Sequence, residues 1–74
     1  MSLVLDLHGV KHADVEYTLD QFFHWENNTR SKSVEVIVGN SLEMKRLTAA
    51  WLDKNNYVYF SPHHNLGTII VWND

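Results

Sequence analysis

Asp6 and His8 lie two positions apart at the end of the first apolar stretch of the chain. In an extended strand such residues point to the same face, with Cα atoms about 7 Å apart. Cleavage of a phosphodiester needs a base, or a metal-held water, together with an acid, and a carboxylate and an imidazole supply both. The pair is a candidate catalytic site, with Asp6 as base or metal ligand and His8 as acid or base. The structural alternative is that Asp6 hydrogen-bonds a neighbouring loop and His8 ends the strand.

A second polar segment, Gly39-Asn40-Ser41, follows another apolar stretch and precedes a helical pattern. A helix start offers unpaired N–H groups and a positive dipole end to an anion such as phosphate, and glycine lets a ligand approach the backbone closely. Lys45, one turn into the helix, would add a cation; the alternative is an ordinary surface lysine. The candidate phosphate-binding residues are therefore Gly9, Gly39, Asn40, Ser41 and Lys45.

The elements that position these residues follow from apolar periodicity. Strict alternation predicts a strand from Leu3 to His8, and β-branched and apolar runs predict strands over 33–38, 57–60 and 68–72. Helical spacing predicts one helix over 11–27 and another that begins at an Asn40 cap and ends at Asn55-Asn56. The predicted order is βαβαββ.

Two successive strand-helix units imply a right-handed crossover and parallel pairing of the first two strands. We expect an α/β fold: a two-layer sandwich, a four-stranded mixed sheet with two helices on one face, and a single domain over residues 3–73. Parallel strands end at the same edge, so Asp6 or His8 should lie within about 10 Å of Gly39. The predicted core between helices and sheet is Val15, Leu19, Phe22, Leu47 and Trp51.

Composition narrows the class of protein. The 74 residues are 45% hydrophobic and contain no cysteine, which excludes disulfides and thiolate metal sites. We find no membrane span or secretory signal and expect a cytoplasmic protein. Six basic residues against nine acidic ones give a net charge of −3, which lowers the expected affinity for nucleic acid and favours a protein partner.

The segment Leu5-Asp6-Leu7-His8-Gly9 resembles the Leu-Asp-x-His-Gly signature that opens Smr (small MutS-related) domains. The family's second signature, Thr/His-Gly-x-Gly, is matched in part by Val38-Gly39-Asn40-Ser41. Trp51-Leu52 and the run from Gly67 to Val71 follow in the family's order, so the resemblance covers nearly the whole chain. It implies a stand-alone Smr domain with the fold βαβαββ.

The resemblance also implies a nucleic-acid partner, DNA or RNA, because members bind or nick nucleic acid. For a nicking endonuclease, a divalent metal such as Mg²⁺ or Mn²⁺ would assist the cleavage. Val38 and Ser41 depart from the second signature, which puts cleavage in question more than binding and leaves the enzyme assignment open.

The alternative function is a noncatalytic module that binds a protein. With only two helices, one sheet face is expected to be partly open, and an aromatic residue there would make a docking surface. Trp72, near the end of the last strand, is also the best candidate for stacking on a base. His63 and His64 suggest a metal site with His8, but adjacent residues in an extended chain point apart, so the metal ligands remain unassigned.

Overall fold

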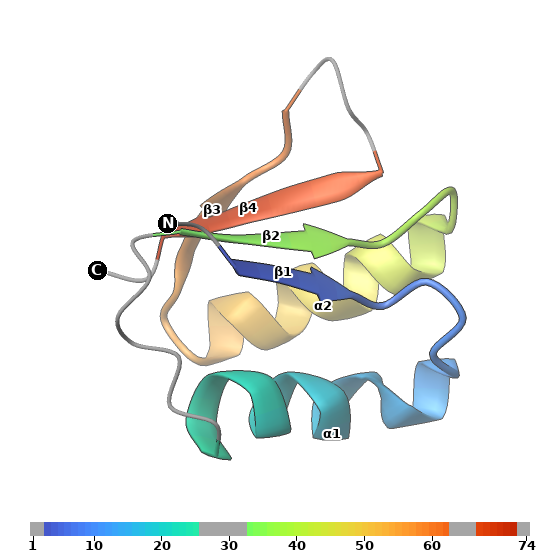
Figure 1. The fold of residues 1–74 in the computed structure, drawn as a ribbon, viewed down its shortest axis with the longest axis horizontal. Coiled ribbons are helices and arrows are strands. Elements are labelled where there is room, and N and C mark those ends of the chain that lie inside the picture. Colours follow the sequence, from blue (N-terminus) through green and yellow to red (C-terminus); the bar gives the residue numbers. More distant parts are fainter. Residues whose placement is uncertain (1–2, 26–32, 63–66, 73–74) are drawn as a thin grey trace.

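The computed structural model describes residues 3–25, 33–62 and 67–72, and its elements follow the predicted order (Figure 1). One four-stranded sheet has the order β1-β2-β4-β3. β1 pairs in parallel with β2, whereas β4 runs antiparallel to both of its neighbours. The pairing confirms the predicted mixed sheet. Both helices lie on the same side of the sheet in Figure 1, which confirms the two-layer α/β sandwich. The strands are β1 (Leu3–Asp6), β2 (Ser33–Ile37), β3 (Val58–Phe60) and β4 (Thr68–Trp72).

The first helical segment is less regular than the predicted single helix. It begins with a 3-10 turn (His12–Asp14), continues as α1 (Val15–Asp20) and ends in a π-helical turn (Gln21–Trp25). Val15, Leu19 and Phe23 follow one another at a spacing of four and are all buried. The prediction that Phe22 is buried was wrong, because this row selects Phe23 and leaves Phe22 half-buried against the edge of the core.

The second helix, α2 (Leu42–Lys54), is capped by Ser41 and not by Asn40. The Ser41 hydroxyl accepts a hydrogen bond from the Met44 backbone N–H at 3.0 Å, so the predicted cap was wrong by one residue. The helix ends at Asn55 as predicted. Within the described ranges no helix is long and apolar enough to cross a membrane. Leu47, predicted to be buried, is only half-buried. The buried residues of α2 are Met44, Thr48, Trp51 and Leu52.

The core lies between the helices and one face of the sheet. Alternate strand residues point into it, so each strand contributes apolar side chains to this layer. The buried strand-side residues are Leu7, Val34, Val36, Val38, Ile69 and Val71. The other set of alternate residues forms the opposite sheet face, which neither helix covers (Figure 1).

Candidate functional site

The chain leaves β1 through a tight turn. The Leu7 N–H donates to the Ile37 carbonyl at 2.9 Å, which extends the parallel pairing one residue beyond β1. The Val10 N–H donates back to the Leu7 carbonyl at 3.0 Å and closes a four-residue turn. Gly9 takes the third position with φ of +89°, a left-handed conformation that favours glycine. This turn holds His8 exposed at the end of the strand.

The Asp6 carboxylate stabilises the same turn. Its Oδ1 accepts a hydrogen bond from the His8 backbone N–H at 2.8 Å. This is the structural role considered from the sequence, a short acidic side chain hydrogen-bonded to the backbone two residues on. Among the described residues, no hydrogen bond joins the Asp6 carboxylate to the His8 imidazole ring. Asp6 therefore orients the segment that carries His8 and does not form a carboxylate–imidazole relay with it.

The turn after β2 lies against the turn after β1. Gly39 has φ of +66°, and an ideal Cβ built on it would lie 3.4 Å from Cδ2 of His8. The two turns are therefore neighbours, as the parallel pairing predicted. Sequence reasoning did not predict the contact with Gly67, whose carbonyl accepts hydrogen bonds from the N–H groups of Val38 at 2.7 Å and Gly39 at 3.1 Å. The Gly39 amide is thus engaged inside the protein and is not a donor for a ligand.

A pocket of about 220 Å³ opens at the start of α2. The first two helical residues, Leu42 and Glu43, have no carbonyl within the helix to accept their N–H groups, so this end carries partial positive charge. Among the described residues, Lys45 is the cation of the lining, and no carboxylate lines the pocket. Gly9, the remaining predicted phosphate residue, shapes the neighbouring turn and is not part of the lining. The lining residues are Gly39, Asn40, Ser41, Leu42 and Lys45.

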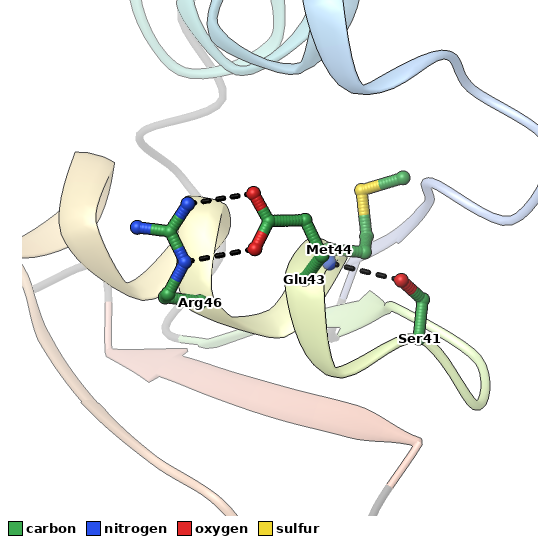
Figure 2. Close-up of polar contacts among 4 residues, drawn as sticks. All are labelled: Ser41, Glu43, Met44 and Arg46. Carbon is green, nitrogen blue, oxygen red and sulfur yellow. Dashed lines mark hydrogen bonds and ion pairs between the residues drawn. The ribbon is translucent and has the colours of Figure 1, made fainter.

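Ser41 holds this helix start without needing to be glycine. Its φ of −89° and ψ of 113° are extended values that any residue adopts. The serine that stands at the second glycine of the family signature therefore introduces no backbone strain, and its hydroxyl supplies the cap. Figure 2 shows the Ser41 side chain bonded to the Met44 amide at the first turn of the helix.

Glu43 and Arg46 form an ion pair on the first turns of α2 (Figure 2). Nε of Arg46 donates to Oε1 of Glu43 at 2.9 Å, and Nη2 donates to Oε2 at 2.6 Å. The hydrogen bond from Arg46 is the main reason that the pKa of Glu43 is lowered, and the charges of Arg46 and His12 add to it. Arg46 is therefore engaged with Glu43 and offsets its charge.

Other candidates lie outside this site. Trp72 pairs in register with Ser33 at the start of β2, which places it roughly 20 Å from Gly39 along the strand. The described ranges contain no group of three or more histidine or acidic side chains that could hold a metal ion. His63 and His64 lie outside the described residues.

The chain was compared with protein-family models, curated proteins and solved structures. The family model described as Smr domain matches residues 5–71 of the chain. No curated protein and no solved structure matches.

Proposed function

The chain belongs to the Smr domain family, and from this premise we propose that it binds nucleic acid by holding a backbone phosphate at the start of α2. One observation carries the proposal: the pocket coincides with the helix start, and its lining in the described part of the chain holds Lys45 and no carboxylate. Phosphate contacts supply most of the sequence-independent affinity for nucleic acid. A single favourable phosphate site also fits a chain whose net charge is −3, because the local charge and not the total acts on the ligand.

The hydrogen bonds at the start of α2 determine which groups remain to bind a phosphate. Ser41 satisfies the Met44 amide, so the amides of Leu42 and Glu43 are the helix donors for a phosphate oxygen. Arg46 neutralises Glu43, which would otherwise repel the phosphate beside the same helix end. Lys45 supplies the attraction that depends on salt.

We also propose that the chain cleaves the nucleic acid that it binds. Cleavage requires, in addition to the phosphate site, an acid–base group next to the scissile bond. His8 meets it best, because its ring lies against Gly39 at the edge of the phosphate site. Asp6 serves as a positioning residue through its hydrogen bond to the His8 amide. Within the described ranges no group of three or more histidine or acidic side chains gathers to hold a resident Mg²⁺ or Mn²⁺, so the roles proposed here are those of His8 and Asp6.

Fluorescence anisotropy against single-stranded, duplex and branched oligonucleotides of DNA and of RNA tests the function. We expect binding at low salt with log K falling linearly against log salt. Amide NMR shifts on titration should gather at residues 39–45 and His8. An absence of binding to every oligonucleotide at low salt, in a folded preparation, would sink the proposal.

A further inference from the structure

The sheet face opposite the helices is largely apolar. Strand register places the side chains that alternate with the core residues on this face, in rows across all four strands. Val58 is 67% exposed, and Phe60 and Trp72 are each 47% exposed. The rings of Phe60 and Trp72 stack with centroids 6.3 Å apart. We call this surface the open face; its apolar residues are Val4, Ile37, Val58, Phe60, Ile70 and Trp72.

Two carboxylates are the ionisable groups of the open face within the described ranges. Glu35 lies in the central row, paired in register with Val4 on one side and with Ile70 on the other. Asp6 lies at the end of β1, next to Ile37. No described cation forms an ion pair with Glu35. A partner that covers the apolar residues would desolvate this carboxylate, which is costly unless the partner brings a positive charge to it.

The layer arrangement indicates the shape of that partner. Parallel strands are usually covered on both faces, whereas in the described ranges the parallel pair β1–β2 has helices on one face alone (Figure 1). A helix laid on the open face would complete a three-layer α/β/α arrangement.

We propose that the open face binds an amphipathic α-helix of a partner protein, with the apolar side of that helix on Phe60, Ile70 and Trp72 and a lysine or arginine beside Glu35. This interface is separate from the phosphate site and does not depend on it. A nucleic-acid strand fits this face less well, because its phosphates would meet the Glu35 carboxylate in the central row. A symmetric pair of identical chains also fits less well, because it would bring two Glu35 carboxylates into one apolar interface.

Two designed peptides serve as probes. Each is about 18 residues long, or about five helical turns, with leucines along one side; one carries lysines on the flanks and the other glutamates. We expect the lysine peptide to bind with NMR shifts confined to the open face, and the glutamate peptide to bind at least about tenfold more weakly. Glu35→Lys should reverse this preference, whereas Glu16→Lys on α1 should not.

Side-chain removal supplies the matched comparison. Trp72→Ser should weaken lysine-peptide binding at least about tenfold, as loss of an aromatic anchor does. Tyr17→Ser should leave it unchanged, since Tyr17 is 66% exposed on α1. If circular dichroism shows that Trp72→Ser disturbs the fold, Phe60→Ser provides a second test of the same surface.

Four results would overturn the proposal. Equal binding of the two peptides would remove the role of Glu35, and shifts on α1 would place the interface elsewhere. Self-association in sedimentation velocity that Trp72→Ser abolishes would assign the face to a second copy. A single-stranded oligonucleotide that shifts the open face would assign it to nucleic acid.

Discussion

His8 lies against Gly39, with its Cδ2 3.4 Å from the position that a Cβ on Gly39 would occupy. The two residues belong to different strand-helix turns, and the parallel pairing of β1 with β2 brings them to one edge of the sheet. The same edge carries the pocket at the start of α2. The two segments that resemble the family signatures therefore lie at one edge of the sheet.

Gly39→Ala should destabilise the protein through its backbone. The φ of +66° is unfavourable for a residue with a Cβ and costs about 1 to 2 kcal/mol of unfolding free energy. The new methyl group meets His8 at an ordinary contact distance, so a clash adds little. Urea unfolding measures the loss. Gly39→Asn is the control and should lose less, because asparagine tolerates this conformation; equal losses would contradict the assignment to backbone strain.

Ser41→Ala should remove the cap of α2 and cost about 1 kcal/mol, whereas Ser41→Gly should cost only a few tenths. Asn40→Ala is the matched control one residue earlier, and its exposed side chain predicts a change within about 0.5 kcal/mol. Thermal or urea unfolding compares the three variants. A larger loss for Asn40→Ala than for Ser41→Ala would return the cap to Asn40.

Arg46→Ala should raise the pKa of Glu43 back toward its ordinary value, because the hydrogen bond from Arg46 is the main cause of the lowering. A lowered carboxyl pKa gives stability that is present at neutral pH and is lost as the pH falls through the folded-state pKa. For this exposed pair the effect on stability is small. Carbon-detected NMR titration of the Glu43 carboxyl follows the change.

The same variant should weaken oligonucleotide binding, because it leaves the Glu43 charge uncompensated beside the pocket. Adding Glu43→Ala to Arg46→Ala should restore binding to the level of the unmodified protein. If the double variant binds as weakly as Arg46→Ala alone, Arg46 contacts the phosphate itself.

Much of the fold could be predicted because local pattern and topology agree. The alternation around Leu5 and the β-branched run over 68–72 specify strands, and two strand-helix units specify the parallel pair. The errors arose where the period is ambiguous. Phe22 and Phe23 are adjacent, and both fit a helical pattern that starts at Val15. The π-helical turn widens the local spacing to four residues and so buries Phe23.

The sequence predicted where the candidate site lies in the fold, but it did not predict which residue caps the helix or which contacts hold the turn. The neighbourhood of His8 and Gly39 follows from topology, but the choice between Asn40 and Ser41 as cap depends on how the Gly39 turn ends. The contact with Gly67 joins segments distant in sequence, so no local pattern could have found it.

In a preparation that nicks supercoiled plasmid, His8→Ala should lower the rate by roughly 100-fold or more, as loss of an acid–base group does. Asp6→Asn should lower it far less, since the amide oxygen can accept the same hydrogen bond from the His8 N–H. Asp6→Ala, which lacks that acceptor, should lose more than Asp6→Asn. Oligonucleotide affinity should hold in the His8 variant. Equal, severe losses for the two Asp6 variants would instead make its carboxylate a base or a metal ligand.

The phosphate site at the start of α2 is tested most directly by the salt dependence of oligonucleotide binding in Lys45→Ala. Because Lys45 lines the pocket, its loss should weaken binding and reduce the slope of log K against log salt by about 0.7 for a single strand or about 0.9 for a duplex, one phosphate contact. Lys54→Ala, in the last turn of the same helix, removes an equal charge far from the pocket and should leave the slope unchanged. A Lys45→Ala slope equal to that of the unmodified protein, or equal reductions in both variants, would contradict a phosphate held at the start of α2.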